Sequence, residues 1–519
     1  MRFNAKRNAK KNIVFGVLEN FVKIICPFIV RTMIIKLLGE NYIGVNSLFT
    51  SFISILSLAE LGFDTAIACV MYDAVAKNEN STLCALLKYL KRVYVIVGTV
   101  ILIVGLLCVP FIKFIIKDPQ NIPGDINTIV VYLIFLFDVV IGYYVGAYKN
   151  SIINAFQRRD IISNIYSISM IITTILQIVV LVISRKYIYF LLIKPLATIM
   201  QNVFVVIISR VLYPDIKPKG KLNDNIIKKV NKIVQGTFCG TVGAKLSVSF
   251  DNIIISSMLG IAVLSRYSNY IYIISALQCL ILVLTTSLKA IIGNKVNTDS
   301  VESNYILLRK LTLIFIWIDS WCTITLFYLI QKFIVIWLGS NSLLPLVDVV
   351  SFSLYFYISV SDGIFQMFKE ALGIFWEDRF RALTGGLVNL LLNILMVIIL
   401  RKINLEYALS GVVLSTSISQ IFILIPWATN VTFNIYFKVG KKSYYKQLIM
   451  GFKVMIISAL ATLPWIWCLD RLVNNIFVNF VMTGIICMII PNICMWLQYR
   501  KFEYYDDTML FVKNLKKQN

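Results

Sequence analysis

The sequence predicts an all-α protein that crosses a membrane about fourteen times. Of its 519 residues, 59% are hydrophobic and only 15% are charged, and no class of soluble protein has that balance. The apolar residues occur in long runs, and a helix needs about 20 of them to span a bilayer. We therefore expect a polytopic membrane protein built from helices alone.

The predicted spans follow one another along the whole chain. They cover residues 12–36, 42–73, 93–117, 128–148, 161–183, 188–212, 230–258, 262–290, 309–337, 344–370, 382–400, 404–430, 445–468 and 474–499. The first residues are basic, but the first apolar run contains charged residues and has no small-residue cleavage site. We therefore expect this run to remain as a helix and not to be removed as a signal peptide.

The net charge of +24 is explained by topology. In a soluble protein this excess would indicate a nucleic-acid partner. Here the lysines and arginines gather in alternate loops, which is the positive-inside pattern and places both termini in the cytoplasm. There are no histidines, and the ten cysteines have no spacing typical of a metal or disulfide site. We expect no cofactor, no metal site and no nucleic-acid partner, and any proton-linked step must use carboxylates.

The second predicted span carries polar residues on one side. At 100° per residue they project within a sector about 120° wide. They are Asn46, Thr50, Ser54, Ser57, Glu60 and Asp64. Carboxylates inside a membrane cost several kcal/mol unless they have partners or water, so Glu60 and Asp64 are candidates for a substrate or ion path. The alternative is a polar seam that holds a helix bundle together.

Other predicted spans add charged and polar residues. In the first span, Glu19 and Lys23 have the i, i+4 spacing that lets opposite charges pair, and Arg31 lies nearer the outer end, where it could reach the interface instead. The spans that begin at 230 and 262 contribute Lys245, Asp251, Asn252, Arg266, Tyr270, Ser275 and Gln278. Aromatic and amide side chains suit contact with a sugar, although tyrosine at a membrane interface is also ordinary.

Similar segments recur at offsets of about 220 residues, a spacing that indicates two halves. LLGENYIG at Leu37 matches MLGIAVLS at Met258, and YKNSI at Tyr148 matches FKEAL at Phe368. Six predicted spans separate the copies, so the halves share one orientation and are related by an axis along the membrane normal. The predicted divisions are an N-terminal lobe at 1–212, a basic cytoplasmic linker at 213–229, a C-terminal lobe at 230–430, and two extra helices with a basic cytoplasmic tail at 431–519.

Three stretches carry a resemblance to a known family. They are GVNSLFTSFISILSLAELGFDTAI from Gly44, FIVIWLG ending at Gly339, and FKEALGIFWEDRFRALTGG from Phe368. They resemble the bacterial polysaccharide repeat-unit flippases of the Wzx type, which are similar to MATE exporters and lipid II flippases within the multidrug/oligosaccharidyl-lipid/polysaccharide (MOP) superfamily. The resemblance implies two pseudo-symmetric six-helix lobes that face a central cavity, and two C-terminal helices. It marks the first, second, seventh and eighth spans as cavity walls.

The function that the resemblance implies is transport by ion-coupled alternating access, without covalent chemistry. The substrate would be an undecaprenyl-diphosphate-linked oligosaccharide, moved across the bacterial cytoplasmic membrane for O-antigen, capsule or exopolysaccharide synthesis. Expected partners are this lipid-linked substrate, the bilayer, and a polysaccharide polymerase with its chain-length machinery.

Candidate residues fall into two sets, and no catalytic residue is among them. The expected substrate-cavity residues are Glu19, Lys23, Arg31, Asn46, Thr50, Glu60, Asp64, Lys245, Asp251, Asn252, Arg266, Tyr270, Ser275 and Gln278. The candidates for binding a coupling H⁺ or Na⁺ are Glu60, Asp64, Asp251 and Asp362. The lysines and arginines suit an anionic diphosphate.

Three other functions stay open. A MATE-type drug or cation antiporter is the nearest, and it would require a cavity of the opposite charge. A lipid II flippase and a membrane polysaccharide polymerase are the other two. The polymerase is disfavoured because the predicted outer loops are short and contain no cluster of acid, base and nucleophile.

Overall fold

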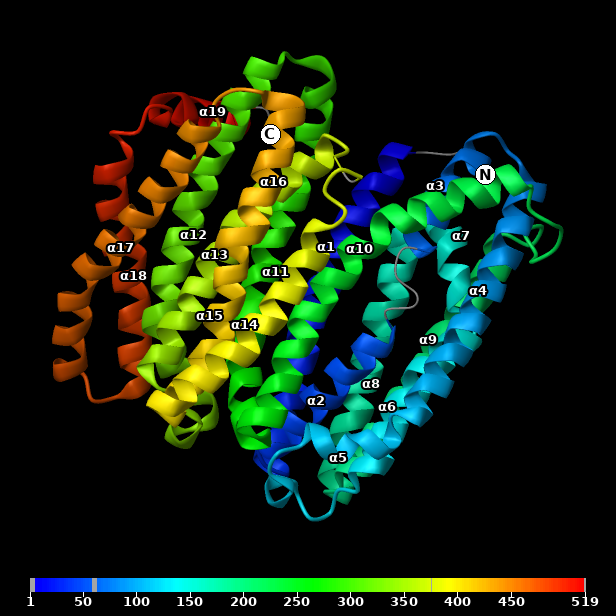
Figure 1. The fold of residues 1–519 in the computed structure, drawn as a ribbon, viewed down its shortest axis with the longest axis horizontal. Helices are drawn as coiled ribbons and strands as arrows, with labels where there is room; N and C mark the ends of the chain where they lie inside the picture. The colour runs from blue at the N-terminus through cyan, green and yellow to red at the C-terminus, as the bar shows by residue number, and fades with distance from the viewer. Residues whose placement is uncertain (1–4, 58–62, 375, 518–519) are drawn as a thin grey trace. The chain divides into compact units, whose positions relative to one another are not determined.

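The computed structural model describes residues 5–57, 63–374 and 376–517, and the regular structure within these ranges is entirely helical (Figure 1). Eleven helices are long and apolar enough to cross a membrane, and the bent pair Thr128–Tyr144 and Ala147–Ala155 would make a twelfth if it forms one span. The prediction of an all-α, multi-pass membrane protein is confirmed.

The other two predicted spans are also helical where they are described. The span predicted at 42–73 contains α2 (Asn41–Leu56) and α3 (Phe63–Ala76), and residues 58–62 between them lie outside the described ranges. The span predicted at 262–290 lies inside α11 (Ile261–Thr298). Neither is among the eleven helices that pass the length and composition test, so the count of fourteen stays a prediction.

The chain divides into two compact units, residues 1–268 (unit 1) and 269–519 (unit 2). Besides α2 and α3, unit 1 contains α1 (Ala5–Leu37), α4 (Asn80–Leu107), α5 (Ile112–Ile115), α6 (Thr128–Tyr144), α7 (Asn150–Ala155), α8 (Arg159–Ser184), α9 (Tyr187–Leu212), α10 (Asp224–Ile254), the π-helical turn η5 (Ile255–Leu259) and the start of α11. In this unit α1 packs along α8, α8 along α9, and α10 along both α2 and α3.

The boundary between the two units falls inside α11, and α10 packs against α2 and α3 within unit 1. The predicted linker 213–229 leads from α9 to α10 within unit 1. The division into lobes at 212 and 230 stays a prediction.

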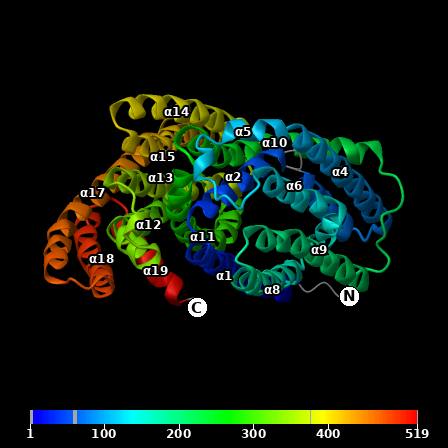
Figure 2. The same cartoon turned by 90° about the horizontal axis from the view of Figure 1, so that it is seen from below.

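Unit 2 begins within α11 and runs to the end of the chain. Its further helices are α12 (Val301–Leu338), α13 (Leu346–Ala371), α14 (Arg381–Ile403), α15 (Ala408–Ser419), the π-helical turn η8 (Gln420–Leu424), α16 (Ile425–Thr432), the π-helical turn η9 (Phe433–Phe437), α17 (Lys441–Leu472), α18 (Ile476–Tyr499) and α19 (Tyr505–Lys517). Within the unit α17 and α18 form a hairpin that packs beside α12, and α19 lies at one end of α12 (Figures 1 and 2).

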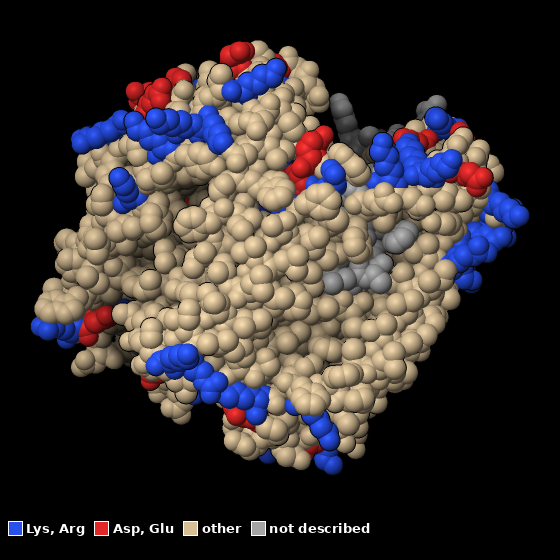
Figure 3. Space-filling model, in the orientation of Figure 1, with Lys and Arg blue, Asp and Glu red and all other residues tan. Residues whose placement is uncertain are grey.

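The outward surfaces of both units are apolar. Some large hydrophobic side chains are exposed over most of their area. Examples are Ile183 (79% exposed) and Val211 (74%) on unit 1 and Phe422 (72%) on unit 2. On the visible face of each unit, charged side chains lie toward the ends of the helices and uncharged residues cover the region between (Figure 3). Contact of such apolar surfaces with lipid is favourable, whereas their contact with water is unfavourable.

Local sequence signals explain where several helices begin. Asn127 accepts a hydrogen bond from Ile129 N at 3.0 Å to cap α6, and Asn475 accepts one from Phe477 N at 3.0 Å to cap α18. Gly39 and Gly260 have φ values of 121° and 102° just before α2 and α11, where other residues would be strained. These two glycines occupy the same place in the matched segments LLGENYIG and MLGIAVLS, so both segments have a positive φ at that position.

Candidate functional site

Glu19 and Lys23 form an ion pair on α1 within unit 1. Lys23 Nζ lies 2.6 Å from Glu19 Oε1. The positive charge of Arg159 at the start of α8 also attracts the Glu19 carboxylate. The Glu19 side chain is 5% exposed, whereas 50% of the Lys23 side chain is exposed. The predicted i, i+4 pair is confirmed. It neutralises a buried carboxylate and leaves half of the lysine side chain accessible.

The start of α1 is fixed to the start of α8. Asn12 Oδ1 accepts a hydrogen bond from Asp160 N at 2.8 Å, and Asn12 Nδ2 donates one to Gln157 O at 3.0 Å. Arg158 Nε donates to Asp160 Oδ1 at 2.9 Å. These contacts hold the helix that carries Glu19 and Lys23 in register with α8. Arg31 lies half-buried toward the other end of α1.

Two of the predicted cavity amides hold helices of unit 1 together. Asn252 Nδ2 on α10 donates to Ser51 Oγ on α2 at 2.6 Å, and Asn46 Oδ1 accepts from the Tyr187 hydroxyl at 3.4 Å. For these two residues the contacts match the polar seam that the sequence left open as an alternative. Thr50 is exposed.

The long polar sector predicted along 46–64 does not continue as one regular helix. Helix α2 ends at Leu56, and Ser57 has φ −76° and ψ 6°, outside the helical range. Among the described residues, the projection at 100° per residue therefore applies to α2 only as far as Leu56. Glu60 lies outside the described residues, and so does the side chain of Asp64 in α3. Their roles in binding substrate or a coupling ion stay predictions.

The predicted residues on α10 and the start of α11 differ in accessibility. Lys245 is exposed, Asp251 is 6% exposed, and Arg266 is half-buried. All three belong to unit 1. The Lys245 side chain therefore lies at the surface of unit 1, whereas Asp251 lies in the interior.

Tyr270 is used for packing inside unit 2. Its hydroxyl donates to Gln331 Oε1 at 2.6 Å and accepts from Leu344 N at 3.2 Å, and its ring stacks on Phe352 with centroids 5.6 Å apart. Tyr270 is 0% exposed, so in this structure its side chain is not accessible to a sugar. Ser275 is exposed and Gln278 is half-buried on the same helix.

A buried cluster of four charged residues joins α13 to α14, and we call it the charge cluster. It consists of Asp362, Lys369, Asp378 and Arg381. Lys369 pairs with Asp378, Arg381 Nε lies 3.0 Å from Asp378 Oδ2, and Arg381 Nη1 lies 3.5 Å from Asp362 Oδ2. The four side chains are 6–14% exposed.

Two acids and two bases make the charge cluster neutral overall. Asp362, predicted as a coupling-ion candidate, therefore has a cationic partner in this structure. The cluster lies in the stretch FKEALGIFWEDRFRALTGG, whose alternating charges are the signal by which the sequence could have indicated it. In the same stretch Gly385 lets α14 pack closely against Leu424 of η8, since a Cβ at this position would lie 2.3 Å from a Leu424 methyl group.

Lys332 binds three oxygen atoms at the α17–α18 hairpin. Its Nζ lies 2.6 Å from Asp470 Oδ1, 2.6 Å from Asn479 Oδ1 and 2.7 Å from Thr483 Oγ1. All three ammonium donors are thus used. Lys332 belongs to α12 and ties this helix to the hairpin.

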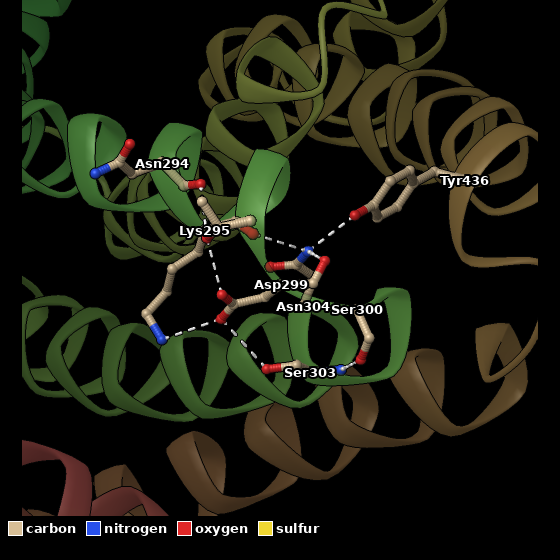
Figure 4. A network of polar contacts seen from close by, with 8 residues as sticks. Asn294, Lys295, Asp299, Ser300, Ser303, Asn304 and Tyr436 are labelled. Atoms are coloured by element: carbon tan, nitrogen blue, oxygen red, sulfur yellow. Dashed lines mark hydrogen bonds and ion pairs between the residues drawn. The ribbon is translucent and has the colours of Figure 1, made fainter.

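The turn between α11 and α12 is also a polar network (Figure 4). Asp299 accepts hydrogen bonds from Thr298 Oγ1 at 2.9 Å and from Ser303 Oγ at 3.5 Å, and Lys295 Nζ lies 3.5 Å away. The hydrogen bond from Thr298 and the charge of Lys295 lower the pKa of Asp299. Asn304 Nδ2 donates to the Tyr436 hydroxyl at 2.9 Å, which joins this turn to η9.

Two further intramembrane groups in unit 1 did not enter the predicted site. Thr198 Oγ1 donates to Asp138 Oδ1 at 2.6 Å, and Lys194 Nζ lies 4.2 Å from the centre of the Phe135 ring. Asp138 and Lys194 are isolated charges within apolar runs, which is the sequence signal that could have identified them.

No family model and no curated protein matches the sequence, whereas solved structures match its fold. The lipid II flippase MurJ in an inward closed conformation has a TM-score of 0.69 and 16% identity, and the match covers 94% of this chain and 99% of that one. An inward-facing MATE family multidrug resistance transporter of the MOP superfamily has a TM-score of 0.59 and 12% identity, over 78% of this chain and 93% of that one.

A third match is the MATE transporter VcmN of Vibrio cholerae, with a TM-score of 0.55 and 14% identity over 82% of this chain and 97% of that one. All three identities are too low to show more than the fold. The chain therefore has the multi-pass, all-α fold that the lipid II flippase and the MATE transporters share.

Proposed function

We propose that this protein is a flippase that moves undecaprenyl-diphosphate-linked oligosaccharide repeat units across the bacterial cytoplasmic membrane for surface polysaccharide synthesis. The observation that carries the proposal is the fold match to a lipid flippase over 94% of the chain. The MATE transporters match 78–82% of it. The flippase fold thus accounts for more of the chain, and its lipid-linked substrate belongs to the proposed chemical class.

The charges of the candidate residues support an anionic substrate. Among the described candidates, Lys245 and half of the Lys23 side chain are exposed, whereas Glu19 and Asp251 are buried. Ammonium and guanidinium groups bind diphosphate oxygens through charge-assisted hydrogen bonds. Within unit 1 we assign Lys23, Arg31, Lys245 and Arg266 to the diphosphate, and the exposed hydroxyl of Thr50 to the sugars.

A MATE-type drug or cation antiporter is the second candidate, because several MATE transporters share the fold. A cationic drug would require accessible, unneutralised carboxylates. Glu19 pairs with Lys23 and Asp362 pairs with Arg381, so these two acids are already compensated. This observation favours the flippase, which performs transport and no covalent chemistry. Both termini would lie in the cytoplasm, and H⁺ or Na⁺ would be the coupling ion.

Reconstitution tests the proposal. Proteoliposomes would contain the purified full-length protein and an undecaprenyl-diphosphate-linked oligosaccharide, and a membrane-impermeant glycosidase would report the glycan in the outer leaflet. We expect the protein to raise the rate at which the remaining, inner-leaflet glycan becomes cleavable at least tenfold over protein-free vesicles. Ethidium efflux without any increase in glycan cleavage would support the antiporter and overturn the flippase.

A further inference from the structure

Asp319 is a carboxylic acid enclosed in the interior of unit 2. It lies midway along α12, a helix of 38 residues, and is 0% exposed. Helices α13, α17 and α18 all pack against α12. A group at this position is removed from water on every side.

The partners of Asp319 are hydroxyl groups. Ser361 Oγ on α13 donates to Asp319 Oδ2 at 2.8 Å, and Thr323 Oγ1 on α12 donates to Oδ1 at 3.4 Å. The titratable groups that face it are Cys322 on α12, Tyr357 on α13 and Tyr499 on α18. In the described part of the chain, α17 and α19 place no charged group against it, and no cation contacts it.

Three other acids in unit 2 show the contrast. Asp362 and Asp378 pair with Arg381, and Asp470 pairs with Lys332. An ionised carboxylate in an apolar interior is costly, and hydroxyl donors supply no opposite charge to compensate for it. One bound proton removes the net charge and leaves the hydrogen-bonded geometry possible, because a protonated carboxyl group both donates and accepts.

Other buried hydroxyl groups lie near this acid. Ser320, the residue after Asp319, has its Oγ 3.4 Å from the hydroxyl of Tyr499 on α18, and Tyr357 on α13 faces the same acid. Tyr499 is the last residue of α18. Tyr499 and Ser320 are both 0% exposed, so these hydroxyl groups are enclosed in the interior together with the acid.

We propose that Asp319, with Ser361 and Thr323, is a proton-binding site of unit 2. The carboxyl group holds the proton while α13 packs against α12 and keeps the site out of water. Separation of the two helices admits water, which solvates the ionised carboxylate and releases the proton. A proton fits better than a metal ion, because the described residues contain no cluster of three or more acidic or cysteine ligands and this site offers a single carboxylate. The use of this proton to drive transport rests on the proposed function, whereas the binding site itself does not.

Infrared difference spectroscopy on the full-length protein in lipid vesicles tests the site. We expect wild type minus Asp319→Asn to show the carbonyl band of a protonated carboxylic acid, shifted by exchange into D₂O. The matched control is Asp362→Asn, whose acid is paired with Arg381, and it should show no such band. A wild type minus Asp319→Asn spectrum that contains only carboxylate bands would overturn the proposal.

Two further measurements complete the test. The thermal midpoint checks that Asp319→Asn is folded, and a proton-movement assay distinguishes proton binding at Asp319 from the use of this proton in transport. The amide resembles the protonated acid, so the thermal midpoint of the variant should stay within about 3 °C of the wild type. In vesicles with an internal pH dye, the substrate should cause proton movement that Asp319→Asn reduces at least tenfold. Wild-type flipping with no proton movement would overturn the coupling alone, and a wild type that does not flip would overturn the proposed function. In both cases the infrared band still decides the binding site.

Discussion

Lys23 in unit 1 and Lys369 in unit 2 are both paired with an acid, but 50% of the Lys23 side chain is exposed and only 8% of the Lys369 side chain is. Lys23 has its acid four residues away on the same helix. Lys369 is enclosed with Asp378 and Arg381, which lie in the loop after α13 and at the start of α14. In the first arrangement half of the lysine side chain is accessible, whereas the second joins two helices and has no accessible face.

This comparison separates charges that can bind substrate from charges that maintain the fold. Breaking a buried pair leaves an uncompensated charge in the interior, whereas an exposed charge is solvated when its partner is lost. Substitutions in the charge cluster should therefore change stability, and substitutions at Lys23 should change transport.

The largest effect should come from Lys369→Met. We expect it to lower the free energy of unfolding by about 3–5 kcal/mol, because Asp378 and Asp362 would then share Arg381 and one buried negative charge would be uncompensated. Denaturant unfolding in detergent, followed by tryptophan fluorescence, measures the change. The double variant Lys369→Met with Asp378→Leu should lose less than the sum of the two single variants. A loss below 1 kcal/mol in the single variant would show that the cluster does not stabilise the fold.

The next effect concerns Lys23. Because Lys23→Ala alone would leave Glu19 buried and unpaired, the informative variant is Lys23→Ala in a Glu19→Gln background. We expect at least a tenfold lower rate of glycan flipping, with a thermal midpoint close to that of Glu19→Gln alone. Lys23→Arg is the matched control and should keep most activity, since it retains the positive charge. Unchanged flipping by the double variant would remove Lys23 from substrate binding.

A smaller effect is expected at the α17–α18 hairpin. Asp470→Asn removes one charge from the Lys332 site, but Asn479 and Thr483 still accept hydrogen bonds from the ammonium group. The Asp470 side chain is 48% exposed, so the cost should stay below about 1 kcal/mol. Lys332→Met, measured in parallel, should cost more because three acceptors lose their donor. Equal losses in the two variants would contradict this assignment.

The smallest effect should be a pH dependence at the turn between α11 and α12. The pKa of Asp299 is lower in the folded protein than in the unfolded chain, so the ionised form stabilises the turn. This contribution is present above the unfolded pKa of about 3.9 and is lost as the pH falls below it. Asp299→Asn should therefore reduce the drop in thermal midpoint between pH 5 and pH 3. An identical drop in variant and wild type would mean that other carboxylates account for it.

The sequence by itself determined the membrane class and most of the helices, because a run of about 20 apolar residues must form a helix to satisfy its backbone in lipid. It also determined the Glu19–Lys23 pair, since residues four apart on one helix are neighbours whatever surrounds them. The matched glycines Gly39 and Gly260 were visible for a similar reason, because the requirement for a positive φ is local.

Only the tertiary structure decided which polar residues are free. Tyr270 was expected in the cavity, but Gln331 and Leu344, more than 60 residues away in sequence, hold its hydroxyl. Likewise Asp319 and Asp362 are alike in sequence, as single acids in apolar runs. They differ because α14 supplies Arg381 to Asp362, whereas Asp319 has only hydroxyl partners among the described residues. Periodicity shows which side of a helix is polar, but the partner comes from whichever distant helix packs against that side.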